Sequence, residues 1–284
     1  MAPTIGLFSM NFNAAADPAT AERIARLTER LGYDSLWVGD HVVLPSPRTE
    51  ASPLDPGTPL LDPVVALTHL AARTEHLLLG AGCIVLPQRN PLVLAKQLAS
   101  VDVLSSGRLL FGVGVGYLEP ELRALGVDPR DRARRAEEYL DAMESLWYDK
   151  SPAFQGTYTS FEGVDAHPRP AQTRVPVVIG GHSTAAHRRA VTRGDAWFGY
   201  LMGLRATAQQ VAALRALAVE HGRDRPLHIS VAPARRLGSE VVRAYGDLGV
   251  DRLVVVPPVD LTADQLADFV EAHAPARLGA APRP

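Results

Sequence analysis

Short apolar runs rich in β-branched residues alternate along the chain with longer stretches whose apolar residues recur at helical spacing. The runs predict eight strands, at residues 4–10, 35–39, 77–86, 109–115, 176–179, 195–201, 227–231 and 252–257. A helix is predicted after each strand, and the first one begins at Asp17-Pro18 and ends at Gly32. Strands that alternate with helices are typical of parallel βαβ units, so the pattern predicts an α/β protein.

Eight such units fit a single (β/α)8 TIM barrel over residues 1–284, with insertions in the loops that follow the strands. An open doubly wound sheet is the alternative, but it normally carries a glycine loop after its first strand, where this chain has Met10-Asn11-Phe12-Asn13. The barrel is therefore preferred. Long excursions are expected at residues 45–60 and 150–174, and residues 275–284 are expected to form a flexible tail.

The composition is that of an ordinary globular protein, with 46% hydrophobic and 21% charged residues. The 29 basic and 31 acidic residues give a net charge of −2, so we expect no nucleic-acid partner. The sequence shows neither a signal peptide nor an apolar run of about 18 residues, so no membrane span and a cytoplasmic location are expected. With one cysteine and nine scattered histidines, neither a disulfide nor a metal site is predicted.

In a barrel of this kind, the residues just after the carboxyl ends of the strands form the active-site face. Asp40 and His41 directly follow the second predicted strand, and Asn11 and Asn13 follow the first. Histidine suits proton transfer near neutral pH, so His41 is a candidate acid/base group and Asp40 a candidate positioning group. The structural alternative is that His41 only hydrogen-bonds a loop and Asp40 caps a turn.

Glycines gather at the ends of the third and fourth predicted strands. Gly112, Gly114 and Gly116 alternate in the fourth, but Tyr117 stands where a dinucleotide fingerprint would need its third glycine. Such glycines indicate a bulge or a closely approaching ligand, here a flat ring, or simply close packing of a helix on the strand. The GAGC segment that ends at Cys83 also predicts a bulge, with the cysteine as a buried apolar side chain rather than a nucleophile.

A turn that could bind an anion follows the fifth predicted strand. Gly180, Gly181, His182 and Ser183 lead directly into a helix, and the free amides of a helix start can bind a phosphate. The alternative is a tight turn in which Ser183 is an ordinary N-cap.

Four segments, in order along the chain, resemble the luciferase-like monooxygenase family, and more narrowly its branch of oxidoreductases that depend on the deazaflavin coenzyme F420. They are LGYDSLWVGDH (31–41), LGAGCIVLPQRNP (79–91), LAKQLASVDVLSSGRLLFGVGVGY (94–117) and VPVVIGGHSTAAHRRAVTRGDAW (175–197). The resemblance implies a (β/α)8 barrel, usually homodimeric, that binds a flat redox ring at the carboxyl ends of its strands. It also implies a cis peptide bond between Gly82 and Cys83, in a bulge that backs the ring.

The same resemblance implies roles for single residues. Asp40 and His41 match the pair after strand two, in which the histidine lies near the reactive face of the ring and exchanges a proton with the substrate. Gly180 and Gly181 match the segment that holds the cofactor phosphate. Tyr117 departs from the pattern, because the sugar-phosphate dehydrogenases of the family carry a glutamate there. A phenol has a higher pKa and is a weaker proton shuttle, so a sugar phosphate is not the expected substrate.

The predicted function is therefore F420-dependent hydride transfer to or from a small, largely apolar organic substrate. Glu119 and Glu121, one helical turn beyond Tyr117, are expected to face solvent. Two alternatives stay open: a monooxygenase that uses reduced FMN and oxygen on the same barrel, and a non-catalytic protein that binds a flavin-like ligand. The expected catalytic residues are His41 and Asp40, and the expected cofactor-binding residues are Gly82, Cys83, Gly114, Gly116, Tyr117, Gly180, Gly181, His182 and Ser183.

Overall fold

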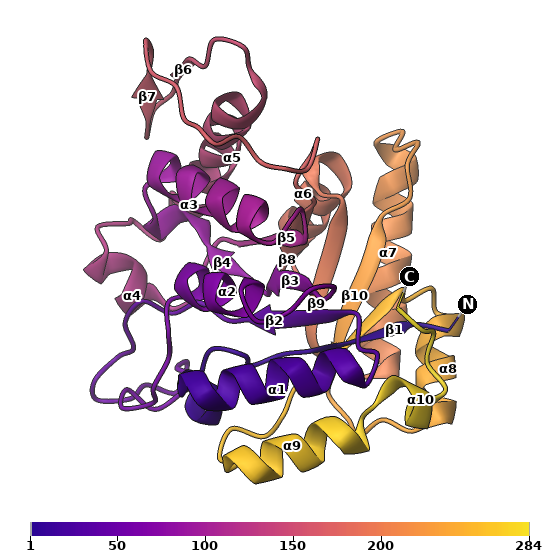
Figure 1. The fold of residues 1–284 in the computed structure, drawn as a ribbon. Helices are drawn as coiled ribbons and strands as arrows, with labels where there is room; N and C mark the ends of the chain where they lie inside the picture. Colours follow the sequence, from indigo (N-terminus) through magenta and orange to yellow (C-terminus); the bar gives the residue numbers. More distant parts are fainter. Residues whose placement is uncertain (1, 284) are drawn as a thin grey trace.

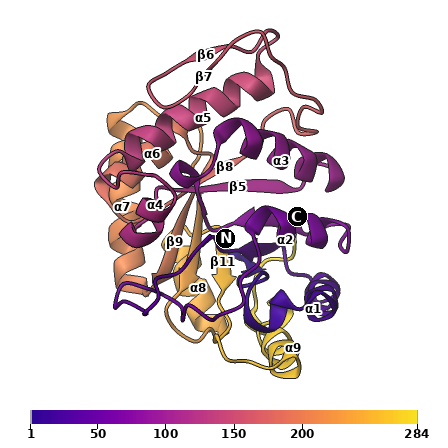
Figure 2. The same cartoon turned by 90° about the vertical axis from the view of Figure 1, so that its left-hand side faces the viewer.

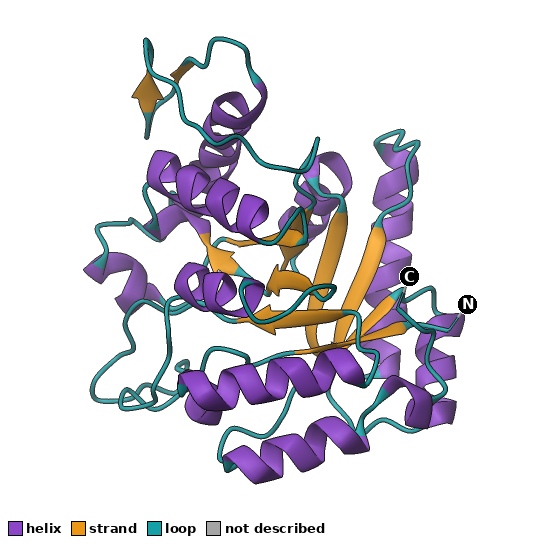
Figure 3. Ribbon diagram, viewed as in Figure 1, coloured by secondary structure: helices purple, strands orange, loops and turns teal. Residues whose placement is uncertain are grey.

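A computed structural model, which describes residues 2–283, shows a closed barrel of eight parallel strands (Figures 1 and 3). The strands are β1 (Thr4–Leu7), β2 (Ser35–Val38), β3 (Leu78–Ala81) continued after a bulge by β4 (Ile84–Val85), β5 (Leu109–Gly114), β8 (Val177–Gly180), β9 (Ala196–Met202), β10 (His228–Pro233) and β11 (Arg252–Val255). Each pairs in parallel with its neighbours, and the barrel closes because β1 pairs with both β2 and β11 while β3 pairs with β5. The predicted (β/α)8 architecture is confirmed.

Helices surround the strands on the outside of the barrel, as the 90° view in Figure 2 shows. They are α1 (Pro18–Arg30), α2 (Pro63–Ala71), α3 (Pro91–Leu104), α4 (Glu119–Ala124), α5 (Arg132–Tyr148), α6 (Thr184–Arg193), α7 (Leu204–Glu220), α8 (Ser239–Asp247), α9 (Ala263–Ala272) and α10 (Pro275–Leu278), with the short 3-10 helices η1 (Asn13–Ala16) and η2 (Leu86–Gln88). The side chains of Asp17, Asp62 and Asn90 accept hydrogen bonds from first-turn amides, and each is followed by a proline. Sequence-local capping therefore fixes where α1, α2 and α3 begin.

Aromatic side chains fill the interior of the barrel. Trp37 of β2 stacks on Phe198 of β9 with ring centroids 5.3 Å apart, and Phe8 stacks on the same ring at 6.3 Å. Gly80 makes room for this stack, because a Cβ there would lie 2.6 Å from the Trp37 ring. The interior is a packed core rather than a pore, so any ligand at the carboxyl ends of the strands would rest on a solid floor.

The two predicted excursions leave the barrel as loops. Residues 42–61 join β2 to α2, and they lie beside α4 at the end of the barrel to which the arrow of β2 points in Figure 1. Residues 150–174 contain a small antiparallel pair, β6 (Phe154–Gln155) and β7 (Ser160–Phe161), which protrudes at the top of that view. Glu138 of α5 holds this pair by accepting hydrogen bonds from three backbone amides of its turn.

The last residues of the chain pack onto the barrel for part of their length. The expected flexible tail, residues 275–284, begins with α10, whose Leu278 side chain is buried in the main core. The amide of Ala281 donates a hydrogen bond to the carbonyl of Pro3, which brings the two ends of the chain together (Figure 1). Residues 275–281 thus make contacts with the barrel, and the flexibility expected of this tail stays a prediction.

Candidate active site

Asp40 is the centre of a buried ion-pair network at the carboxyl end of β2. Its carboxylate accepts hydrogen bonds from Arg89 Nη2 at 2.6 Å and from the amide of Val85 at 2.9 Å, and Arg89 also pairs with Asp62 at 2.8 Å. Burial raises the pKa of Asp40, and the guanidinium of Arg89 and the amide of Val85 oppose this rise. With both carboxylate oxygens engaged, Asp40 ties β4 and the end of η2 to the end of β2.

His41 is held by a carboxylate that the sequence reasoning placed in solvent. Nδ1 of His41 lies 2.7 Å from Glu121 Oε2, and Glu121 Oε1 accepts hydrogen bonds from the amide of Val42 at 2.6 Å and the side chain of Gln88 at 3.2 Å. The Glu121 side chain is 2% exposed, whereas that of Glu119 is 58% exposed. The prediction was therefore wrong for Glu121, because α4 turns this residue toward β2 and only Glu119 faces water.

A signal for Glu121 does exist in the sequence. Leu118, Glu121, Leu122 and Leu125 recur at the spacing of one helical face, and both Leu118 and Leu122 are 1% exposed. A carboxylate within an apolar helical stripe is buried, and a buried carboxylate requires a partner.

Tyr117 lies over the edge of His41. The two rings meet at 87° with centroids 6.0 Å apart, and 59% of the tyrosine is exposed. Burial around its hydroxyl group raises the pKa of Tyr117, and the nearby Tyr200 and Glu121 raise it further. The phenol therefore stays protonated at neutral pH and can donate a hydrogen bond into the site.

The predicted bulge is present between β3 and β4, and the peptide bond between Gly82 and Cys83 is cis, as the family resemblance implied. The sulfur of Cys83 occupies the space above Gly180, where any Cβ would overlap it, and a Cβ at Gly114 would lie 3.3 Å from Cys83 Cβ. Burial raises the pKa of the Cys83 thiol to about 12. Cys83 is thus a protonated, space-filling side chain, and two of the candidate glycines serve to accommodate it.

The start of α6 is compatible with both predictions made for it, a serine N-cap and a turn that can bind an anion. Ser183 is an N-cap, since its hydroxyl accepts a hydrogen bond from the amide of Ala186 at 3.2 Å, and it keeps its own hydrogen for donation. Gly181 has a φ of +117°, and its carbonyl accepts from the indole of Trp197 at 2.8 Å. No acidic residue stands in the first turn of α6, so the positive end of the helix remains free for an anion.

His182 and Gly116 serve mainly to fix the local backbone. Nε2 of His182 accepts a hydrogen bond from the amide of Tyr200 at 3.1 Å, and burial lowers the pKa of His182, so its ring is neutral at neutral pH. Gly116 has a φ of +78°, and a Cβ there would lie 2.8 Å from a methyl group of Val85. This glycine is required by the turn that directs the chain into α4.

The structure brings most of the predicted residues to one end of the barrel. His41, Tyr117 and Glu121 meet on one side, and Cys83 bridges from the bulge to Gly180 on the other. Among residues 2–283, no group of three or more potential metal ligands occurs. No helix in the described chain is long and apolar enough to cross a membrane.

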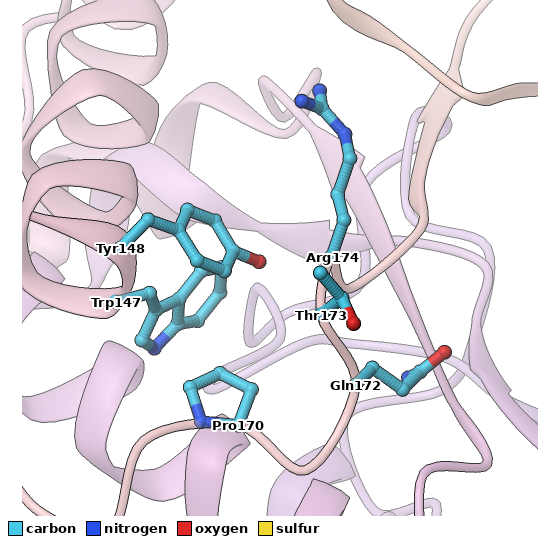
Figure 4. Close-up of a pocket in the computed structure, with 6 residues that line it drawn as sticks. All are labelled: Trp147, Tyr148, Pro170, Gln172, Thr173 and Arg174. Atoms are coloured by element: carbon cyan, nitrogen blue, oxygen red, sulfur yellow. The ribbon is translucent and has the colours of Figure 1, made fainter.

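An open cavity of about 570 Å³ lies away from the carboxyl ends of the strands. It is found between the last turn of α5 and the segment that leads into β8 (Figure 4). Its polar groups are already engaged: the Tyr148 hydroxyl accepts from the amide of Val175, Arg174 lies 3.6 Å from Asp195, and the Gln172 amide donates to Asp102. We assign no ligand to it.

Comparison with known proteins identifies the family. The family model for luciferase-like monooxygenases matches residues 4–245. An uncharacterised protein of Mycobacterium tuberculosis is 30% identical over 275 residues, which cover 94% of this chain and 95% of that relative. The chain also shares its fold with two solved proteins of lower identity. The F420-dependent tetrahydromethanopterin reductase from Methanopyrus kandleri has a TM-score of 0.75 at 13% identity, over 98% of this chain and 100% of that one. The monooxygenase RslO1 from Streptomyces bottropensis has a TM-score of 0.73 at 18% identity, over 96% and 99%. This chain therefore belongs to the luciferase-like monooxygenase family.

Proposed function

We propose that the protein is an F420-dependent oxidoreductase that transfers hydride between the deazaflavin and a small, largely apolar organic molecule. One observation carries the proposal: His41 is fixed by the buried Glu121 carboxylate at the open end of the barrel. Hydride transfer to a carbonyl carbon needs a proton donor at the oxygen, and the reverse reaction needs a base there. A histidine whose orientation is fixed by a carboxylate suits both directions.

The residues around the bulge fit a flat ring with a phosphate tail. Gly82 and Gly114 keep the floor around Cys83 free of larger side chains, and the first turn of α6 offers amides with no acidic residue beside them. Gly82, Cys83 and Gly114 would hold the ring, and the turn at Gly181 and Ser183 would bind the phosphate. When bound, the deazaflavin supplies or accepts the hydride, whereas reduced FMN would react with oxygen.

The protein's own groups manage the proton. Nδ1 of His41 is engaged by Glu121, so Nε2 is the atom that exchanges a proton with the substrate oxygen. Glu121 is itself held by the amide of Val42 and by Gln88, which fixes the plane of the imidazole. Tyr117 keeps its proton and can donate a second hydrogen bond.

The surface beside His41 favours an apolar substrate. The nearby charges are paired with one another, Asp40 with Arg89 and Glu121 with His41. The next side chain along, Val42, is 47% exposed, and Leu201 at the end of β9 is 50% exposed. Exposed apolar side chains at a site mouth favour a ligand with apolar surface of its own.

Titration of the pure protein with F420 and, separately, with FMN, followed by fluorescence quenching, tests the proposal. Binding of F420 at least ten times tighter than that of FMN supports it. Micromolar binding of FMN without binding of F420 overturns it in favour of a flavin monooxygenase. A His41→Ala variant that binds F420 and leaves turnover unchanged would instead indicate a non-catalytic binding protein.

We also propose that the protein acts as a homodimer. Val65 on α2 is 63% exposed and Val93 on α3 is 55% exposed, and the two helices pack side by side. Exposed apolar side chains on two helices that pack together favour a surface that a second copy covers.

A further inference from the structure

Tyr200 stands at the open end of the barrel, on the strand that faces β2 from the opposite side. In the closed sheet, β9 is the fourth strand from β2 in either direction, so the two strands lie across the barrel from each other. One layer lower, Trp37 of β2 and Phe198 of β9 meet in the interior with ring centroids 5.3 Å apart. Phe198 pairs with Gly180, the last residue of β8, so Tyr200 lies beyond the end of that neighbouring strand.

The side chain of Tyr200 continues the aromatic column of the barrel interior, which consists of Trp37, Phe198 and Phe8. Successive side chains of a strand alternate between its two faces, so Tyr200 shares the inward face with Phe198. The ring contacts agree, because the Tyr200 centroid lies 6.3 Å from that of Phe198 and 5.5 Å from that of Phe8. The rings of the column are at most 5% exposed, whereas Tyr200 is 39% exposed. Tyr200 is therefore the ring at which the column reaches the open end.

The bulge at Gly82 borders the same aromatic column. A Cβ at Gly82 would lie 3.0 Å from the Phe8 ring and 3.1 Å from the Phe198 ring, so these two rings support both the bulge and Tyr200. The amide of Tyr200 donates to Nε2 of His182 at 3.1 Å, which ties Tyr200 to the turn before α6. Tyr200 is thus next to the positions proposed for the cofactor ring and its phosphate.

Three rings border the open end from three different strands. The Tyr117 ring, after β5, stands edge-on to His41 and is 59% exposed, and Tyr200 is close enough to contribute to the raised pKa of Tyr117. β5 lies two strands from β2 and two strands from β9. A substrate whose oxygen lies at Nε2 of His41 would therefore extend across this end of the barrel toward Tyr200.

We propose that Tyr200 is a substrate-binding residue, and that the substrate is an alcohol or ketone whose oxygen-bearing carbon is attached to an aromatic ring. The proposal rests on the proposed function, because it takes the substrate oxygen to lie at Nε2 of His41. The substrate ring then packs against the exposed part of Tyr200. Aromatic pairs gain binding energy beyond that of buried area alone, so Tyr200 favours an aryl group over a saturated ring. The cofactor ring is also flat, so the experiment must separate the two ligands.

Calorimetric titration with acetophenone and with cyclohexyl methyl ketone, without and with oxidised F420, tests the proposal. Both probes carry the same methyl ketone, so their contacts with His41 cancel in the ratio of the two dissociation constants and only the six-membered ring differs. We expect Tyr200→Leu to shift this ratio by about fivefold against acetophenone, the magnitude of one aromatic pair. Tyr200→Phe keeps the ring and should leave the ratio within about twofold of that of the wild type.

Tyr148→Leu is the matched control, because Tyr148 is 41% exposed and lies at the end of α5, beside the open cavity described above. It should leave both dissociation constants unchanged. A shifted ratio in Tyr148→Leu would place the ketones in that cavity and overturn the proposal. An unchanged ratio in Tyr200→Leu also overturns it, as does a wild type that fails to bind acetophenone both without and with F420.

F420 binding to the same variants separates the substrate from the cofactor. Unchanged F420 affinity in Tyr200→Leu, together with a shifted ketone ratio, supports the proposal. Lost F420 affinity with an unchanged ketone ratio would assign Tyr200 to the cofactor and overturn the substrate assignment. Failure of the wild type to bind F420 would count against the proposed function alone, because the titrations without cofactor still measure the ketone ratio.

Discussion

The two ring nitrogens of His41 have different duties. Nδ1 is committed to Glu121 at 2.7 Å, and this leaves Nε2 free for the proposed proton exchange with the substrate. The carboxylate that orients the ring is buried and is itself held by the amide of Val42 and by Gln88. A change at Glu121 therefore acts on the reaction through the orientation and tautomer of the imidazole.

Glu121→Gln should lower kcat by about 10²-fold, because an amide can present its nitrogen to Nδ1 and reverse the imidazole tautomer. The F420 dissociation constant should stay within twofold of that of the wild type. The measurement is steady-state turnover followed by F420 absorbance across pH. A positioning role moves the pH profile of kcat, whereas loss of structure alone lowers the active fraction at every pH.

Glu119→Gln is the control for this pair, because the Glu119 side chain is 58% exposed and bonds to Arg123 on its own helix. It should leave kcat and its pH profile unchanged. Equal kcat values for the two variants would show that His41 does not depend on Glu121.

Gly180→Ala tests the fit around the bulge. A Cβ at this position overlaps the sulfur of Cys83, so the substitution should lower the free energy of unfolding by about 1–3 kcal/mol, measured by urea denaturation. In a Cys83→Ala background the sulfur is absent, so adding Gly180→Ala there should lower the free energy of unfolding much less than it does in the wild type. Strictly additive effects would mean that the two residues do not compete for the same space.

Some of these residues were open to prediction from the sequence and others were not. Asp40 and His41 could be found because the residue after a barrel strand faces the open end by geometry. Glu121 shares an apolar helical face with Leu118 and Leu122, so its burial could be predicted from the sequence. Its contact with His41 depends on the direction of α4 and could not. The contact of Cys83 with Gly180 depends on the approach of two segments that are distant in the sequence, which no local pattern encodes.

At the scale of elements, hydrophobic periodicity was sufficient to find the strands but not their ends. β1 was expected to extend to residue 10, yet it ends at Leu7, because the positive φ of Ser9 takes the chain out of the ladder. The third strand was expected to be continuous with a bulge, and it divides into β3 and β4 at Cys83. In both places the strand gives up regular pairing next to the proposed ligand-binding end of the barrel.

The first residue of β10 gives the barrel a pH-dependent stability. Burial, with the nearby Arg252 on β11, lowers the pKa of His228 to about 4 from an ordinary value of 6.5. The folded state therefore favours the neutral ring, while the unfolded chain takes up a proton at higher pH. The free energy of unfolding is therefore highest, as far as His228 is concerned, above about pH 6.5, and it falls progressively as the pH drops toward 4.

Urea unfolding of the wild type at several pH values from 7.5 to about 4.5 measures this loss, and His228→Gln should flatten the profile over that window. His76→Gln is the control, because the His76 side chain is 61% exposed. A profile that stays equally steep in His228→Gln would show that other groups cause the acid sensitivity.

At the scale of the whole molecule, one surface feature is left without a role inside the chain. α2 is apolar on most of its residues, yet Val65 is exposed to water, as is Val93 on the neighbouring helix α3. A helix that is apolar on nearly every side is normally covered. The outer face of α2 and α3 is therefore where we expect the partner subunit of the proposed homodimer.

Light scattering during gel filtration should give twice the chain mass of 30.5 kDa for the wild type. Val65→Asp/Val93→Asp places two carboxylates where the interface would exclude water, so this variant should elute with the mass of a single chain, because buried unpaired charges oppose association. Val219→Asp is the control: Val219 on α7 is 84% exposed, and the same change there should leave the dimer intact. A monomeric wild type would remove the proposed interface, and a double variant that remains dimeric would place it elsewhere.

F420 binding to the monomeric variant then decides whether each barrel holds a complete site. We expect that it does, because His41, Glu121 and Cys83 all come from one chain.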